Sequence, residues 1–286
     1  MTSPIPTSSE RPSEAGPLLE ARSLSKNFGS VAACSEISLS VRDGERRLVA
    51  VVFGYACHAT VLDFYQWSGD YPGFAQAALE ESHPGMTALF WAGCGGDQNP
   101  VPRREPSLCQ QHGQKLAEAV ERVLTGVMHP VEDRMATSYR EIDLPFAALP
   151  SREELQQQLA SGNKYEAARA RKLLSEIDTG RSLSPSYPYP VQVWRLGSDV
   201  NLIALGGEVV VDYALRLKAE LGRERTWVAG YTNDVMAYIP SRRVLAEGGY
   251  EGGGAMVYYG LPTAWSPESE ELIVREVHVQ VGQDAK

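Results

Sequence analysis

Nearly continuous apolar stretches alternate with amphipathic stretches from about residue 47 to about residue 280. The stretches that predict strands are RLVAVVFGYACHA, TALFWAGCGGDQNP, MATSYREIDLPF, YPVQVWRLGSDVNLIALGGE and RTWVAGYTND. Those that predict helices are YPGFAQAALEE, with Pro72 near its first turn, LCQQHGQKLAEAVERVLTG, closed by Gly126, and VVVDYALRLKAELG. Because such apolar strands need cover on at least one face of their sheet, the pattern predicts an α/β fold, a mixed β-sheet with flanking helices.

Two further segments leave alternatives open. SREELQQQLASGNKYEAARARKLLSEIDTG begins with Ser151 and Glu154 in the spacing of a capping box, which predicts a helix or two helices broken near Gly162. Its polar composition predicts a position on the surface. EELIVREVHVQV, near the end of the chain, is compatible with a helix or a strand.

Polar groups follow several of the predicted strands. They are His58, the segment GGDQN at 95–99, Gly207 with Glu208, and Asn233-Asp234 with Tyr238. Reactive groups collect on loops at strand ends in sheets of this kind, so the four clusters together indicate a site. Each also has a structural interpretation: a histidine beside apolar residues is commonly a core or boundary residue, glycines turn the chain, and Glu208 suits the first turn of a helix.

Composition narrows the possible partners. The chain has 286 residues, a net charge of −9, and basic residues that are scattered rather than clustered. This pattern disfavours nucleic acid and anionic membranes as partners. Four cysteines, none in a CxxC pair, indicate neither a disulfide scaffold nor a zinc finger. No signal peptide or membrane-spanning stretch is evident, so we expect a cytoplasmic chain without an integral membrane segment.

The first 46 residues differ in character from the rest. Residues 1–17 are rich in Ser, Pro and Glu and predict a disordered tail. Residues 18–46 predict two short strands around a glycine turn, and they resemble the start of ABC transporter ATP-binding subunits, with Phe28 where an aromatic ring stacks on adenine. The phosphate loop that such subunits require, G-x-x-x-x-G-K-S/T, is absent from all 286 residues, which argues against ATP hydrolysis.

Residues 47–280 resemble the neutral/alkaline non-lysosomal ceramidase family, especially its shorter bacterial members. The resemblance rests on GYACHATVL, FYQWSGDYPGFAQAALEE, ALFWAGCGGDQNPVPRR, SYPYPVQVWRLG, ALGGEVVVDYALRLKAEL and WVAGYTNDVMAYIPSRRVLAEGGYEGGG. It implies a zinc-dependent amidase that acts on a small-molecule or lipid amide, such as a sphingolipid. The family holds Zn²⁺ with two histidines, a glutamate and a tyrosine, and its members are often exported.

Residue by residue, the resemblance implies that His58, Glu208 and Tyr238 are metal ligands. Tyr250 then matches the tyrosine near the scissile carbonyl. The segment that carries the catalytic serine in ceramidases, GDVSPN, corresponds to residues 96–100 here, so Asp97 and Asn99 become candidate catalytic residues, with Asn99 in place of the serine. An amide side chain cannot act as that nucleophile or proton carrier.

The family's other zinc histidine lies in an upstream motif like SHTHSGP, which this sequence lacks. Its five histidines are His58, His83, His112, His129 and His278. We therefore expect three parts: a tail at 1–17, an ABC-like segment at 18–46, and at 47–280 a ceramidase-like hydrolase domain whose N-terminal part is missing. The functional hypotheses are an impaired zinc-dependent amide hydrolase, an inactive remnant of one, and, less favoured, a nucleotide-binding fragment.

Overall fold

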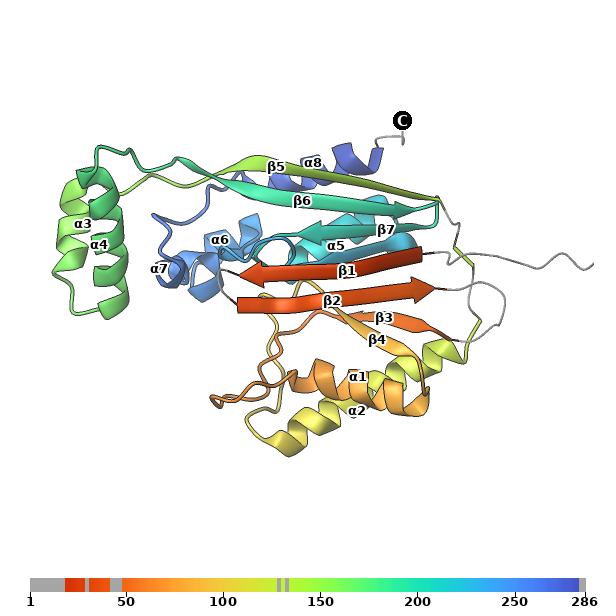
Figure 1. Ribbon diagram of the computed structural model, residues 1–286. Coiled ribbons are helices and arrows are strands. Elements are labelled where there is room, and N and C mark those ends of the chain that lie inside the picture. Colours follow the sequence, from red (N-terminus) through yellow and green to blue (C-terminus); the bar gives the residue numbers. More distant parts are fainter. Residues whose placement is uncertain (1–18, 29–30, 42–47, 128–129, 132–133, 283–286) are drawn as a thin grey trace, which may run out of the picture.

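The computed structural model describes residues 19–28, 31–41, 48–127, 130–131 and 134–282, and only the backbone of 19–41 (Figure 1). The predicted tail at 1–17 and the turn at Gly29-Ser30 lie outside the described residues. The strands are β1 (Leu19–Phe28), β2 (Val31–Val41), β3 (Ala50–Tyr55), β4 (Thr87–Ala92), β5 (Met135–Pro145), β6 (Ser186–Leu196), β7 (Val200–Leu205), β8 (Glu208–Val209), β9 (Thr226–Ala229) and β10 (Tyr238–Ile239). The helices are α1 (Asp70–Ser82), α2 (Pro106–Leu124), α3 (Arg152–Leu159), α4 (Lys164–Asp178), α5 (Val211–Leu221), η1 (Arg223–Arg225), α6 (Arg242–Glu247), η2 (Tyr250–Gly254), α7 (Met256–Tyr259) and α8 (Ser269–Gly282).

The largest sheet is mixed and has the order β5-β6-β7-β9. β5, β6 and β7 are antiparallel neighbours, and β7 pairs with β9 in parallel. β6 and β7 form the hairpin predicted around Gly197-Ser198. A bridge between Gly93 and Ala229 connects the end of β9 to the end of β4, which pairs in parallel with β3. The predicted mixed α/β architecture is confirmed.

α5 and α8 cover one face of this sheet and bury the main core (Figure 1). The core includes Val191, Ile203 and Val228 from the strands and Leu217 from α5. The segment that the sequence left open between helix and strand is the helix α8. Its buried positions include Ser269, Ile273, Val277 and Gln280, which recur at helical spacing and turn one stripe toward the sheet.

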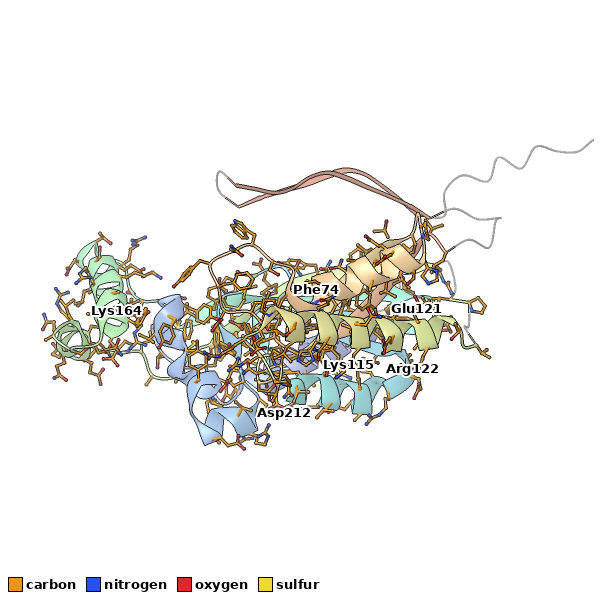
Figure 2. All side chains as sticks on the ribbon, turned by 90° about the horizontal axis from the view of Figure 1, so that it is seen from below. Phe74, Lys115, Glu121, Arg122, Lys164 and Asp212 are labelled. Carbon is orange, nitrogen blue, oxygen red and sulfur yellow. The ribbon has the colours of Figure 1, made fainter. Side chains whose placement is uncertain are left out.

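α1 and α2 lie side by side and cover one face of β3 and β4 (Figure 2). Their close approach depends on Gly113 of α2. A Cβ at this position would lie 2.5 Å from the Cβ of Phe74 and 2.8 Å from the carbonyl oxygen of Tyr71, both on α1. Only glycine allows the two helix backbones to come this near.

α3 and α4 form a helical hairpin at one end of the molecule (Figure 1). The capping box is confirmed, because the Ser151 hydroxyl accepts from the Glu154 amide at 3.2 Å and Glu154 accepts from the Ser151 amide at 2.7 Å. Asn163 caps the second helix, so the segment breaks into two helices near Gly162, as one of the two alternatives predicts. The hairpin has a small core of its own, built around Leu155.

β1 and β2 pair antiparallel in a separate two-stranded sheet, which confirms the two predicted strands. Their resemblance to ABC ATP-binding subunits remains a prediction from the sequence. Within the described part of the chain, no helix is both long and apolar enough to cross a membrane.

We expect Gly113→Ala to lower the free energy of unfolding by about 1–3 kcal/mol, because the added methyl group forces α1 and α2 apart. Gly73→Ala is the matched control in the same helix pair, since a Cβ at Gly73 meets nothing within 4 Å. That substitution should be neutral or stabilise by about 0.5–1 kcal/mol. Urea unfolding of both variants measures the difference, and equal stabilities would contradict the proposed constraint.

Candidate metal and catalytic site

The ends of four strands meet at one point of the fold, as the sequence predicts. His58 follows β3, Gly96 follows β4, Glu208 begins β8 just after β7, and Tyr238 begins β10 after β9. β8 and β10 pair in parallel with Glu208 opposite Tyr238, so the two side chains share a face of this short pair. The histidine is tied to the β4 loop by its amide, which donates to the carbonyl oxygen of Gln98 at 2.9 Å.

The glycine pair of the β4 loop permits this meeting. A Cβ at Gly95 would lie 2.5 Å from the amide nitrogen of Cys57, and one at Gly96 would lie 2.5 Å from the carbonyl oxygen of Glu208. The Gly96 amide also donates to the carbonyl oxygen of Val209 at 2.9 Å. The glycines therefore do more than turn the chain: they let the β4 loop pass between the backbones that carry His58 and Glu208.

The hydrogen bonds of His58 define its tautomer. Its Nε2 lies 2.9 Å from the carbonyl oxygen of Gly96, which can only accept, so Nε2 carries the proton. Nδ1 is then an acceptor, and the Tyr231 hydroxyl donates to it at 3.1 Å. The carboxylate oxygen Oε2 of Glu208 lies 3.8 Å from the same nitrogen, and both side chains are largely buried, with 13% and 14% of their surface exposed.

Three further tyrosines lie around this pair. Tyr259 donates a short hydrogen bond to Oε1 of Glu208, which leaves Oε2 directed toward His58. The Tyr238 hydroxyl lies 3.4 Å from Nε2 of His58, and the ring of Tyr250 packs on that of Tyr238 with centroids 5.3 Å apart.

Burial raises the pKa of Tyr231, Tyr238, Tyr259 and Tyr250, and the negative charge of Glu208 raises each pKa further. The phenols therefore stay protonated at neutral pH. Protonated hydroxyls are available to donate hydrogen bonds to a substrate oxygen.

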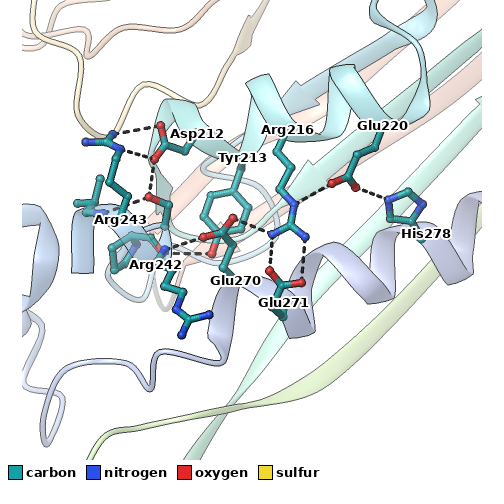
Figure 3. Close-up of polar contacts among 12 residues, drawn as sticks. Asp212, Tyr213, Arg216, Glu220, Arg242, Arg243, Glu270, Glu271 and His278 are labelled. Carbon is teal, nitrogen blue, oxygen red and sulfur yellow. Dashed lines mark hydrogen bonds and ion pairs between the residues drawn. The ribbon is translucent and has the colours of Figure 1, made fainter. Parts of the chain in front are cut away.

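The strand that carries Tyr238 is fixed from both sides. The indole of the buried Trp265 donates to the carbonyl oxygen of Tyr238 at 2.8 Å. Just after β10, Ser241 caps α6 and donates to Asp212 of α5 at 2.5 Å. Figure 3 shows how ion pairs extend this link: Arg243 binds Asp212, and Arg216 of α5 binds the carboxylates of α8. The network holds α5, α6 and α8 together behind the site.

The candidate catalytic residues have different surroundings. Tyr250 lies against Tyr238 and is 48% exposed, so it borders the site. The Asp97 carboxylate accepts from the amide of Val211 at 2.9 Å and so binds the first turn of α5. Asn99 is exposed, accepts from Arg103 at 3.0 Å, and lines a neighbouring cavity of about 450 Å³. These contacts bring Tyr250 to the His58–Glu208 pair and engage Asp97 and Asn99 elsewhere.

Tyr231 and Tyr259 were not predicted from the sequence as site residues. Tyr231 lies two residues after the end of β9 and adopts φ 56°, a left-handed conformation that is costly for a bulky residue. Its position after an apolar strand is the sequence feature from which a place in the site could have been predicted. Tyr259 lies in the short helix α7 and reaches Glu208 only through tertiary packing. By contrast, Asn233 and Asp234 bind Gln192 and Tyr187 at the sheet.

A metal ion would need a tyrosine in its ligand set. Among the described residues, no group of three or more His, Cys, Asp or Glu side chains could hold a metal. His58 and Glu208 offer two donors whose 3.8 Å separation is within two zinc–ligand bonds of about 2.0–2.2 Å each. The Nε2–H bond to a backbone carbonyl is the usual outer contact of a metal-binding histidine. The donors present therefore fit Zn²⁺ if a neighbouring hydroxyl supplies the third.

The mixed α/β fold is similar to part of two solved ceramidase structures. The neutral ceramidase from Pseudomonas aeruginosa matches 87% of this chain and 47% of its own, with a TM-score of 0.58 and 17% identity. A ceramidase complexed with C2 matches 87% of this chain and 49% of its own, with a TM-score of 0.56 and 15% identity. This chain thus spans about half the length of both, and at these identities the likeness concerns the fold. Neither a family model nor a curated protein matches the chain.

Two conservative substitutions should change the zinc affinity in opposite directions. Tyr231→Phe removes the hydroxyl that donates to Nδ1 of His58, so we expect zinc to bind about 2- to 10-fold more tightly. Tyr259→Phe removes the donor that orients Glu208, and we expect zinc to bind about 10-fold more weakly. Competition with a fluorescent zinc chelator measures both.

Tyr139→Phe is the matched control, because it removes an exposed hydrogen bond to Glu141 and should leave the affinity unchanged. Weaker binding by the Tyr231→Phe variant would instead identify Tyr231 as a metal ligand.

Proposed function

We propose that this protein is a zinc-dependent amide-bond hydrolase of the ceramidase-like type, with its metal held by His58, Glu208 and Tyr238. The observation that carries this proposal is the largely buried pair formed by Nδ1 of His58 and Oε2 of Glu208, 3.8 Å apart and surrounded by tyrosine hydroxyls. Buried carboxylates and histidines grouped at strand ends are typical of catalytic sites. The fold shared with solved ceramidases supports the same reaction class.

Different residues of the chain would bind the metal, orient its ligands and donate to the substrate. Bound zinc would supply a Lewis acid and an activated water for attack on the amide carbonyl. The Gly96 carbonyl holds the tautomer of His58, and Tyr259 holds the orientation of Glu208. The neutral hydroxyl of Tyr250 can donate to the carbonyl oxygen as its negative charge develops. The substrate would be a small-molecule or lipid amide.

We infer that this activity is impaired in the chain as it stands. The family resemblance implies a second zinc histidine upstream, and no histidine precedes His58 in the sequence. Asn99 stands at the position of the ceramidase serine and is bound by Arg103 at the surface. Tyr231 favours the alternative of an inactive remnant, because its hydroxyl occupies the nitrogen that a metal would use.

Zinc should bind with one-to-one stoichiometry but weakly, since a missing contact around a metal typically costs about 10- to 100-fold in affinity. Isothermal titration of the metal-free protein measures this. We expect His58→Ala and Glu208→Gln to abolish the binding. The control is His112→Ala, because His112 is partly exposed and donates to the carbonyl oxygen of Pro102, away from His58 and Glu208. Tight binding that survives His58→Ala would refute the ligand assignment.

Ceramide hydrolysis should not be detectable. Loss of a single donor to the reacting oxygen commonly costs about 10²–10³ in rate, and this chain lacks several of the family's groups at once. The measurement is a fluorogenic ceramide assay with added zinc, run beside a neutral ceramidase. Any residual hydrolysis should concern activated esters and should fall in Glu208→Ala. Turnover within about tenfold of the ceramidase would contradict the inferred impairment.

A further inference from the structure

A run of three tyrosines leads from the candidate site to the helical hairpin. The ring of Tyr250, which packs on Tyr238, lies 5.9 Å from the ring of Tyr258 of α7, and Tyr258 lies 4.7 Å from Tyr165 of α4. At the inner end, the Tyr238 ring lies 6.1 Å from that of His58. We call Tyr250, Tyr258 and Tyr165 the tyrosine run.

All three rings are about half exposed, at 48% for Tyr250, 53% for Tyr258 and 43% for Tyr165. Within the described residues their hydroxyls form no hydrogen bond, so each can still donate and accept. Clustered aromatic surface of this kind marks binding sites more often than chance exposure does. The run therefore offers aromatic faces and free hydroxyl groups together.

The elements that carry the rings are fixed relative to one another. Asn163 caps α4 at its first turn, where Tyr165 lies, and Lys172 of the same helix donates to the carbonyl oxygen of Gly260 at 3.1 Å. This bond fastens the hairpin beside α7 (Figure 1). The ammonium of Lys164, labelled on the hairpin in Figure 2, lies 4.8 Å above the ring of Tyr165 and marks the outer end of the run.

The chemistry of the run decides between two kinds of ligand. The hydrocarbon chain of a lipid binds best in an enclosed groove of aliphatic side chains. The three tyrosine rings are instead open to water and carry unpaired hydroxyls. Ligand rings that are apolar on their faces and hydroxylated at their edges match both properties. Sugar rings have this character, and amino sugars commonly carry an N-acyl amide.

We propose that the tyrosine run binds the sugar rings of an N-acylated amino-sugar oligomer and delivers one of its amides to His58 and Glu208. The proposal rests on the proposed amide hydrolase function and names its substrate class. Hydrolysis would add water across the C–N bond, so that the acyl group leaves as a carboxylic acid and the sugar retains a free amine. Successive rings meet at angles of 45° and 67°, so a ligand would contact the outer faces and edges that they leave exposed.

Isothermal titration of the metal-free full chain tests the binding. The probes are the tetramer of N-acetylglucosamine, cellotetraose, which has the rings without the amides, and N-dodecanoyl ethanolamine, a lipid amide. We expect both sugars to bind and Tyr258→Ala to weaken them by about 2- to 10-fold. Tyr258→Phe should retain most of the affinity. Tyr139→Ala removes a tyrosine of similar exposure, 52%, outside the run and should change nothing.

The possible results separate this proposal from the enzymatic one. Absence of sugar binding, or an equal loss in Tyr139→Ala, would overturn the role of the tyrosine run while leaving the zinc titration unaffected. Binding of the lipid amide alone, weakened by Tyr258→Ala, would overturn the sugar assignment. If this protein binds the sugars but the zinc titration detects no binding, the role of the tyrosine run would stand and the proposed zinc-dependent hydrolase would be excluded.

Discussion

The approach of three backbones at Gly95 and Gly96 is the contact on which the site depends. A Cβ at Gly95 would lie 2.5 Å from the amide nitrogen of Cys57, and one at Gly96 would lie 2.5 Å from the carbonyl oxygen of Glu208. The same loop provides the carbonyl oxygen that accepts from His58 and so leaves Nδ1 free to accept. The tautomer of His58 and its spacing to Glu208 thus depend on one steric condition, which glycine alone meets.

A single carboxylate dominates the chemistry of this region. Glu208 is largely buried, and its charge adds to the effect of burial in raising the pKa of four tyrosines around it. Tyr259 compensates part of the cost of burying that charge by donating to Oε1. The result is an acceptor-rich pair, His58 and Glu208, enclosed by protonated donors. Such an arrangement suits a cation between the pair and a developing anion beside the hydroxyls.

The strands differ in how completely helices cover them. α5 and α8 bury one face of the mixed sheet, and α1 and α2 bury one face of β3 and β4. On the other face of β3 and β4, Val52 and Leu89 are 48% and 36% exposed, although parallel strands are commonly covered on both sides. Ion pairs and hydrogen bonds around Arg216 and Asp212 then fix α5, α6 and α8 where apolar packing ends, so the segment after Tyr238 has a defined position.

The sequence by itself determined the features that depend on local periodicity and turn chemistry. Apolar runs and caps predicted the strands, the capping box at Ser151, the hairpin at Gly197 and the clustering of His58, Gly96, Glu208 and Tyr238 at strand ends. It left α8 open because β-branched residues suit a strand as well as a buried helical stripe. Only the tertiary structure decided that Tyr231 and Tyr259 join the site, that Asp97 binds α5, and that the tyrosine run is continuous. Those contacts join residues distant in the chain, and their geometry depends on how helices and strands pack, which no local pattern encodes.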